Sequence, residues 1–294
     1  MASSIVVRLD RPVRTVAGFG IGLRYEHVAD LLATGRQVDF LEIIPENWMR
    51  PRERALLAPV IERWPILAHS IHLSIGGLDP IDLPFLASMR DACARVQSPV
   101  FSDHICYSAI DGLQTNELLP LPFSDEALDN TLARIAAVKP ELGVPLVLEN
   151  PSYYSVMPGS TMEEGTFLRR IIEEGDCGML LDVNNVFVNS QNHGYDPRAL
   201  IDQMPLERVF YIHLAGHRMR EHLATIVDTH SRPIRDEVWA LYEYTIARAG
   251  RQIPTLIEWD SELPTLDALL DELDRARTHA AAALSNRPGA SSAR

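Results

Sequence analysis

Short apolar runs recur along the chain, and a longer stretch with the periodicity of an amphipathic helix follows each of them. The apolar runs are predicted as eight strands, at residues 16–24, 39–45, 66–74, 99–107, 145–152, 177–185, 209–217 and 254–260. The stretches that follow are predicted as eight helices, at residues 25–35, 51–63, 84–96, 124–139, 161–174, 197–204, 233–250 and 264–284. This alternation is typical of repeated strand–helix units built around a parallel sheet.

Eight strands alternating with eight helices over about 250 residues indicate an α/β fold of the TIM (β/α)8 barrel type. A doubly wound open sheet is the alternative, but it rarely needs eight regular units, and no GxGxxG motif follows the first predicted strand. No linker divides the pattern, so residues 1–284 are predicted to form a single barrel domain. The tail SNRPGASSAR, residues 285–294, is small and polar and is predicted to be disordered.

Polar residues gather at the C-terminal ends of these runs, where TIM barrels carry their catalytic residues. The run LLDVNNVFVNSQNHGYD, residues 180–196, passes from apolar residues into a dense set of Asn, Asp and His. A turn explains part of this, because Asn and Asp tolerate left-handed backbone, but similar endings recur elsewhere. The imidazoles and carboxylates that a closed barrel would bring to one rim are His69, His104, Glu149, Asp182, His213, Asp228, His230 and Glu258.

These residue types in one place predict a metal site. Several carboxylates at close quarters cannot all stay ionised without compensating positive charge, and the motifs contain few Lys or Arg residues. Divalent or trivalent cations supply that charge. The set lacks Cys, which disfavours structural zinc, while mixed His and carboxylate ligands suit iron, manganese or catalytic zinc. So many ligands imply more than one metal, and Glu149 is available as a bridge.

Each His of the set has a plainer interpretation, because a single His at a strand end is more often a hydrogen-bonded residue than a metal ligand. Matching positions on so many runs favour the joint metal hypothesis. His72 lies three residues after His69 and should face the opposite side of a regular strand, so a structural role, or support of a ligand, is predicted for it. His217 shares the parity of His213 but lies further along, which suits contact with a substrate or support of a ligand.

The composition indicates which kinds of partner the protein can bind and in which cellular compartment it is expected. The formal net charge is -13, and no block of Lys or Arg occurs, which argues against binding to nucleic acid or to anionic membranes. No apolar run approaches the roughly 20 residues that span a bilayer, and the N-terminus lacks a signal peptide, so a cytoplasmic protein is expected. The three cysteines, Cys93, Cys106 and Cys177, form no CxxC pair and are expected to be buried free thiols.

The motifs resemble those of the multinuclear non-heme iron-dependent oxidative enzymes, a family that includes the methanobactin biosynthesis oxidase. The resemblance rests on GFGIGLR, PENW, HSIHLSIGG, SDHICYS, LENPS, LDVNNVFVNSQNHGYD, YIHLAGH, DTHS and IEWD, which follow one another through most of the chain. It implies a TIM barrel whose rim holds two or three irons. It also implies an oxidoreductase that uses dioxygen to modify a ribosomally synthesised precursor peptide, often at cysteine.

The resemblance further implies three sets of iron ligands. One iron would be held by His69, His104 and a bridging Glu149. A neighbouring iron would be held by Asp182, His213 and Glu258. The third and more labile position would be held by Asn185, Asp228 and His230. The first two sets form the expected catalytic group.

The segment at residues 189–196 is interpreted as a loop over the site, in which His193 contacts the substrate or caps the loop. Asn150 and His217 are further candidates for contact with the substrate. The chain departs from the family at Ser70, because members often have Gly after the first His of HSIHLSIGG. We expect this change to reshape the substrate pocket without removing a ligand.

Family members commonly work with a small partner protein that recognises the leader of the precursor, and the chain shows no separate recognition module, so such a partner is predicted. Two other functions compete with the peptide oxidase. A divalent-metal sugar isomerase or metal-dependent hydrolase, of the xylose isomerase or endonuclease IV type, also assembles His, Glu and Asp at strand ends. A non-catalytic peptide receptor is disfavoured, because buried charge destabilises a fold unless a function retains it.

Overall fold

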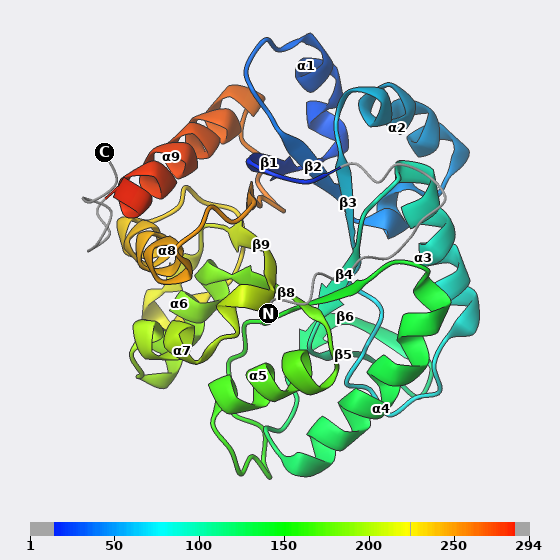
Figure 1. Cartoon of the computed structure of the whole chain (residues 1–294), viewed down its shortest axis with the longest axis vertical. Coiled ribbons are helices and arrows are strands. Elements are labelled where there is room, and N and C mark those ends of the chain that lie inside the picture. The colour runs from blue at the N-terminus through cyan, green and yellow to red at the C-terminus, as the bar shows by residue number, and fades with distance from the viewer. Residues whose placement is uncertain (1–14, 224, 286–294) are drawn as a thin grey trace, which may run out of the picture.

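Parallel strands close into a barrel that helices surround (Figure 1). A computed structural model describes residues 15–223 and 225–285 of the chain. The barrel strands, in chain order, are β1 (Phe19–Gly22), β2 (Phe40–Ile43), β3 (Ile66–His69), β4 (Phe101–His104), β7 (Leu146–Glu149), β8 (Gly178–Asp182), β9 (Val209–Leu214) and β12 (Thr255–Ile257). Every predicted strand is confirmed. Because β1 pairs with both β2 and β12, the sheet is closed and the open-sheet alternative is excluded.

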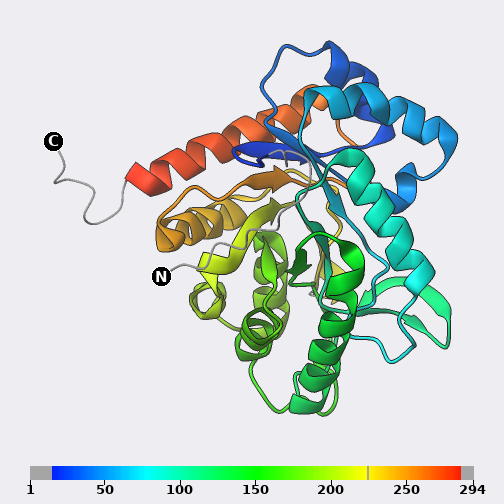
Figure 2. The same ribbon diagram turned by 45° about the vertical axis from the view of Figure 1, so that its right-hand side comes forward.

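The predicted helices also form and cover the outside of the barrel. They are α1 (Val28–Ala33), α2 (Pro51–Arg63), α3 (Leu83–Val96), α4 (Asp125–Leu142), α5 (Glu164–Glu174), α7 (Pro197–Gln203), α8 (Asp236–Ala249) and α9 (Leu266–Ser285). Short 3₁₀ turns are η1 (Tyr25–His27), η2 (Pro45–Trp48), η3 (Leu206–Arg208) and η4 (Glu221–Leu223). Figure 2 shows α8 and α9 side by side along one flank of the barrel. Of the predicted tail, Ser285 is the last residue of α9, and residues 286–294 lie outside the described part.

One segment differs from its prediction. The strand predicted at 177–185 ends at Asp182, and a helix, α6 (Val183–His193), replaces the predicted loop over the site. The Asp182 carboxylate caps this helix, because its Oδ1 accepts a hydrogen bond of 2.6 Å from the backbone N–H of Asn185. The Asn-rich composition suggested a turn, but Val183, Val186 and Ser190 lie one helical turn apart and are buried. The loop prediction for residues 189–196 is therefore wrong, and only the stretch after His193 connects to α7.

Two hairpins that the sequence did not predict extend from the ends of barrel strands. They are β5 (Tyr107–Ile110) with β6 (Leu113–Leu119), and β10 (Arg218–Arg220) with β11 (Thr225–Val227). Both follow a strand whose C-terminal end carries a predicted metal ligand, β4 and β9. They therefore stand beside the rim where those ligands lie.

The interior of the barrel consists of two layers that differ in polarity. We call the first the apolar layer; it is a cluster separate from the one under the helices and contains Phe40, Leu67, Val100, Val147, Leu180, Tyr211 and Leu256. Two residues further along each strand lies the polar layer, which contains Glu42, His69, Ser102, Glu149, Asp182, His213 and Glu258. Residues i and i+2 of a strand share a face and lie about 6.6 Å apart. On β1, Gly20 lies beside Phe40 of the apolar layer in place of a larger residue. A Cβ atom at this position would lie 2.6 Å from the carbonyl oxygen of Phe40.

Two further expectations concern the cysteines and the helices. Cys93, Cys106 and Cys177 are buried free thiols, as the sequence predicts. Among the helices described, none combines the length and the apolar composition that crossing a membrane requires.

Candidate metal centre

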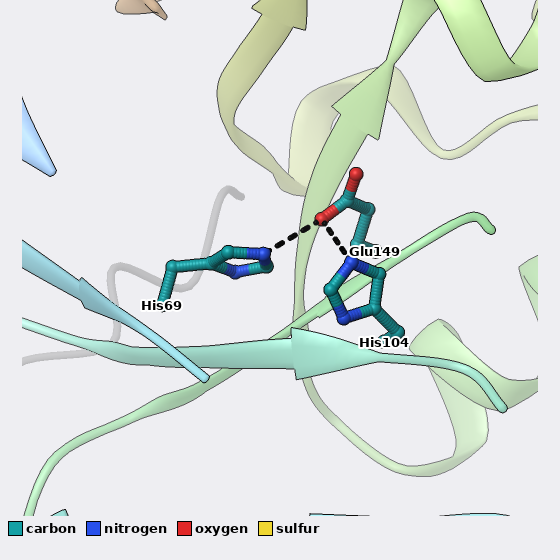
Figure 3. Close-up of side chains that lie close together, drawn as sticks. All are labelled: His69, His104 and Glu149. Carbon is teal, nitrogen blue, oxygen red and sulfur yellow. Dashed lines mark ion pairs between the residues drawn. The ribbon is translucent and has the colours of Figure 1, made fainter. Parts of the chain in front are cut away.

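A first group of candidate ligands lies at the ends of three adjacent strands, β3, β4 and β7 (Figure 3). The Oε2 atom of Glu149 lies 3.2 Å from Nε2 of His69 and 3.2 Å from Nε2 of His104. The two imidazole rings meet edge to face with centroids 4.7 Å apart. Since both rings point at one carboxylate oxygen and all three side chains are buried, the arrangement can enclose a metal ion.

A second group shares Glu149 with the first. It contains Glu149, Asp182, His213 and Glu258, each of which offers a ligand atom within 4.8 Å of the others. Nδ1 of His213 lies 3.0 Å from Oε2 of Glu258 and 3.6 Å from Oε1 of Glu149. Because its two oxygens face different groups, Glu149 is placed as a carboxylate that can bridge two metals.

A third set, which we call the rim group, contains Asp228, His230 and Asp260 and lies closer to solvent. Nδ1 of His230 lies 3.1 Å from Oδ2 of Asp260, and the other carboxylate oxygen of Asp260, Oδ1, forms an ion pair with Arg24. Nε2 of the same ring lies 2.7 Å from Oδ1 of Asp228 and 3.9 Å from Oδ2 of Asp182. An Nδ1–H donated to Asp260 leaves the Nε2 lone pair facing Asp228 and Asp182. The Asp260 side chain is 40% exposed, whereas those of the first two groups are at most 9% exposed.

Several of these side chains hold buried polar atoms that lack a hydrogen-bond partner within the described residues. The atoms are His104 Nδ1, Glu149 Oε2, Asp182 Oδ2, Asn185 Oδ1, His213 Nδ1 and His230 Nε2. Buried polar atoms are normally paired, and leaving one unpaired costs about 1–3 kcal/mol. Each of these atoms belongs to a predicted metal ligand. The residues present therefore fit a metal centre with mixed nitrogen and oxygen donors.

The electrostatics of the groups agree with a site short of positive charge. Burial alone would lower the pKa of His104, but the carboxylates of Glu149 and Asp103 outweigh burial and raise this pKa to about 9. Burial, together with the charges of Glu149 and Asp228, raises the pKa of Asp182 well above its usual value. His69 is the exception, because burial and the neighbouring His104 lower its pKa well below the usual value.

The pKa values of His213, His230 and Glu258 are shifted by the charges of these residues on one another. Burial opposes the change, but Glu42 and Glu258 raise the pKa of His213 well above its usual value, as Asp228 and Glu258 do for His230. In return, His213 and His230 overcome the effect of burial and hold the pKa of Glu258 well below its usual value. Without a metal, protons on these imidazoles would balance part of the carboxylate charge.

A cavity of about 310 Å³ opens beside the three groups. His69, His104, Glu149, Asn185, Asp228, His230, Glu258 and Asp260 all contribute to its wall. Apolar contacts come from Ile44, Ile71 and Leu118, and the last of these lies on the β6 hairpin strand. A substrate in this cavity would therefore contact candidate ligands on one side and apolar side chains on the other.

The residues that were predicted to contact substrate lie in three different places. Asn150 is buried, and both ends of its amide bond the backbone of Asp182, at 2.9 and 3.0 Å, so it ties β7 to β8. His217 bonds Asn184, whose amide in turn donates to Oδ1 of Asp228, so it supports the rim group. His193 ends α6 and lines a second cavity, of about 480 Å³, where its ring stacks on Tyr153.

The sequence reasoning missed several residues that support the groups. Glu42 accepts from Tyr211 at 2.6 Å and lies 3.1 Å from Nε2 of His213. The parity of Phe40 and Glu42 on one strand was the signal that could have placed Glu42 in the barrel. Arg24 and Asp260 were missed because their roles depend on His230, whose positive φ of 42° no strand or helix pattern predicts.

Ser70 directly follows His69 and lies at the edge of the first group. Its hydroxyl donates to Oε1 of Glu46 at 2.5 Å, and the backbone N–H of Ile71 donates to the same oxygen at 3.2 Å. Nδ1 of His72 lies 3.4 Å from that oxygen as well. His72 is therefore turned toward Glu46, in agreement with the structural role predicted for it.

Comparison with known protein families matches residues 18–281 to the family described as RiPP precursor modification enzyme MbnB/TglH/ChrH. RiPP denotes a ribosomally synthesised and post-translationally modified peptide. A UPF0276 protein of Anaeromyxobacter sp. (strain Fw109-5) is 42% identical over 273 residues, covering 92% of this chain and 95% of that protein. A UPF0276 protein of Caulobacter vibrioides (strain NA1000 / CB15N) is 40% identical over 268 residues, with 90% and 95% covered.

Solved structures with a similar fold are much more distant in sequence. D-Psicose 3-epimerase from Clostridium cellulolyticum superposes with a TM-score of 0.61 at 12% identity, covering 91% of this chain and 99% of that one. Endonuclease IV from Thermus thermophilus gives a TM-score of 0.57 at 15% identity, with 90% and 98% covered. At such identities the likeness establishes the barrel fold alone.

Proposed function

Since the chain belongs to the MbnB/TglH/ChrH family of RiPP precursor modification enzymes, we propose that it is an iron- and dioxygen-dependent oxidase of a ribosomally synthesised peptide. The observation that carries this proposal is the pair of buried groups that share Glu149. A shared carboxylate between two sets of imidazoles and carboxylates suits two metals held side by side. Nitrogen and oxygen donors without thiolates suit iron among the redox-active metals.

The first and second groups would hold the two buried irons. Their donors are Nε2 of His69 and His104, Nδ1 of His213, and the carboxylates of Glu149, Asp182 and Glu258. Asp228 and His230, with the free amide oxygen of Asn185, would hold a third and more labile ion. The exposure of Asp260 beside His230 is the reason to expect easier loss of that ion.

Iron in these groups would supply a position for a substrate thiolate and the redox chemistry by which dioxygen removes hydrogen from the bound residue. The residues of the chain position that substrate. The cavity, at about 310 Å³, is near the small end of ligand pockets and accepts one side chain with its adjacent backbone. Ile44, Ile71 and Leu118 exclude water from the apolar side of that residue. Cysteine is the proposed target, since its thiolate is a soft ligand and its size suits the cavity.

A small partner protein that binds the leader of the precursor is also proposed. The support for it is that the described residues form one barrel, with two short hairpins as the main additions at its rim. Co-purification with the product of a neighbouring gene tests this part. Full activity of the chain alone on the precursor, with no complex formed, would remove it.

The experiment for the main proposal is elemental analysis of anaerobically purified protein, followed by Mössbauer and EPR spectroscopy before and after exposure to air. We expect two or more irons per chain and a signal that changes with dioxygen. The precursor encoded nearby, incubated with this protein and air, should then change in mass at a cysteine. Zinc or manganese alone, with no gain on iron reconstitution, would instead favour the sugar isomerase or hydrolase alternative.

A further inference from the structure

A chain of hydrogen bonds joins a histidine of the first group of candidate ligands to a histidine of the second. Ser102, Tyr211 and Glu42 lie between His69 and His213, and all five side chains are buried. Nδ1 of His69 lies 3.1 Å from Oγ of Ser102, which lies 2.7 Å from the Tyr211 hydroxyl. That hydroxyl donates to Oε2 of Glu42 at 2.6 Å, and Nε2 of His213 lies 3.1 Å from the same oxygen.

The proton positions at the Glu42 end follow from the donor inventory of each group. The ionised Glu42 carboxylate can only accept, so Tyr211 and His213 both donate to its Oε2 atom. The single proton of the Tyr211 hydroxyl is thereby used. In the neutral form of His213, the form that can bind a metal, the proton therefore lies on Nε2, and the lone pair is on Nδ1. That Nδ1 atom faces Glu149 and Glu258 in the second group.

The same reasoning continues to the other end. Because Tyr211 gives its proton to Glu42, its oxygen can only accept from Ser102 at 2.7 Å. Donation from Ser102 to the carbonyl of Ala68, at 3.3 Å, would leave two oxygens facing each other without a proton between them. Ser102 therefore donates to Tyr211 and accepts from Nδ1–H of His69. The lone pair of His69 is then on Nε2, which faces Glu149 at 3.2 Å.

We propose that Ser102, Tyr211 and Glu42 are positioning residues that fix the tautomers of His69 and His213 so that both lone pairs face the metal groups. This inference rests on the proposed metal centre and extends it to residues outside the ligand set. Ligating imidazoles whose second N–H is hydrogen-bonded are fixed in orientation, and loss of such a partner lowers metal affinity by roughly 10–100-fold. The hydroxyl of Tyr211 joins the two ends of this hydrogen-bond chain, so it serves both groups.

Nuclear magnetic resonance of the zinc-loaded protein tests the tautomers directly, since zinc is diamagnetic and accepts the same donors. With the histidine rings labelled with ¹⁵N, we expect the retained proton on Nδ1 of His69 and on Nε2 of His213. Each resonance is assigned by its loss in the variants H69Q and H213Q. A proton on the other nitrogen of either ring, in the intact protein, would overturn the proposal.

The metal affinity of three variants tests whether the hydrogen-bond chain through Tyr211 supports both groups. Tyr211→Phe removes the hydroxyl that serves both ends, so zinc affinity should fall by roughly 10–100-fold at both groups. Ser102→Ala cuts the chain on the side of His69 and should weaken the first group more than the second. The matched control is Tyr242→Phe, because Tyr242 is also fully buried and bonds a hydroxyl, that of Thr255 at 2.8 Å, away from the site. It should bind zinc as the unmodified protein does.

The outcomes separate this inference from the proposed function. If Tyr211→Phe lowers zinc affinity at the second group alone, the hydrogen-bond chain does not position His69. Unchanged zinc affinity at both groups would refute the inference entirely. If Tyr211→Phe does not fold, Ser102→Ala with the tautomer spectrum decides the question. Correct tautomers in a protein that holds metal but never oxidises a peptide would sink the proposed function and leave this inference standing.

Discussion

The apolar and polar layers of the barrel interior lie two residues apart on the same strands, yet they do opposite things for the fold. The apolar layer packs Leu67 and Leu180 among fully buried neighbours, and such packing stabilises the folded state. The polar layer places His69 and Asp182 at the corresponding next positions, where buried charge opposes folding unless it is compensated. One alternation along each strand therefore separates the residues that hold the barrel from those that carry its chemistry, except at Tyr211, whose ring lies in the apolar layer while its hydroxyl bonds Glu42 of the polar layer.

A bound metal would compensate for the buried charge of the polar layer. A ligand that binds the folded state and not the unfolded state stabilises the fold by mass action. Metal bound to the polar layer would therefore offset the cost of burying its carboxylates, while the apolar layer would work equally well without metal. Variants in the polar layer should therefore change metal content, whereas variants in the apolar layer should change the free energy of unfolding.

The largest effect is expected at Glu149, the carboxylate shared by two groups. Glu149→Gln keeps the shape of the side chain but removes the charge that two cations share. We expect metal affinity to fall by roughly 100-fold or more, and peptide oxidation with it. The metal-free fold should persist, since the apolar layer is untouched. Metal content by mass spectrometry and unfolding of the metal-free protein by urea are the measurements.

The matched control for this variant is Val147→Ala, two residues earlier on the same strand and in the apolar layer. It should keep its metal and lose stability. A Glu149→Gln protein with full metal content, or a Val147→Ala protein without metal, would show that the two layers are not separate in function.

The second effect concerns the apolar layer alone. Leu180→Ala removes a fully buried side chain and should lower the free energy of unfolding by about 2–5 kcal/mol, through lost burial and a cavity. Metal content per folded chain should stay at the level of the unmodified protein, although Asp182 is only two residues away. Leu78→Ala is the control, since Leu78 is 89% exposed and its removal should leave the stability unchanged.

The third effect is a pH dependence whose sign depends on metal. In the metal-free protein the pKa of His104 is raised from 6.5 to about 9, because the carboxylates of Glu149 and Asp103 outweigh its burial. The stability that this proton contributes is fully present below pH 6.5 and is lost as the pH rises to about 9. The raised pKa values of His213 and His230 act in the same direction. Each proton lost in this range contributes about 1.4 kcal/mol per pH unit.

Bound metal should reverse this trend, because metal replaces protons on the imidazoles and binds more tightly as the pH rises. Urea unfolding at a pH near the ordinary histidine pKa of 6.5 and at a pH near the raised value of about 9 measures both slopes. The two samples are the metal-loaded protein and protein stripped by a chelator. The same slope in both would mean that the metal does not bind the polar layer.

The barrel itself could be predicted from the sequence because strand and helix periods are local properties of the chain. The grouping of the candidate ligands could be predicted because His69, Glu149 and Glu258 end apolar runs, and a closed barrel brings such ends together. What escaped prediction depends on contacts between distant strands. Tyr211 reads as an ordinary strand residue until the barrel closes and its hydroxyl meets Glu42, 169 positions away.

The helix α6 escaped prediction for a different reason. Its first turn contains Asn184 and Asn185, residues that favour turns when judged alone. Burial of Asn184 and Asn189 by specific partners, such as the carboxylate of Asp228 and the carbonyl of Pro151, overrides that preference. Local propensity is a weak guide wherever a polar residue has a buried partner from another strand or loop.

The smallest effect is expected at His193, which lies in neither layer. Its Nε2–H donates to the carbonyl of Tyr153 at 3.0 Å, and its ring stacks on Tyr153 with centroids 4.3 Å apart. His193→Ala should lower the free energy of unfolding by roughly 1 kcal/mol, the usual contribution of one hydrogen bond. The exposed His222 provides the control, since His222→Ala should leave the free energy of unfolding unchanged.

Metal content should be normal in both the His193 and the His222 variant, because the cavity that His193 lines is separate from the one that the candidate metal ligands line. Loss of metal in His193→Ala would extend the metal-dependent region beyond the polar layer and break the separation between fold and chemistry.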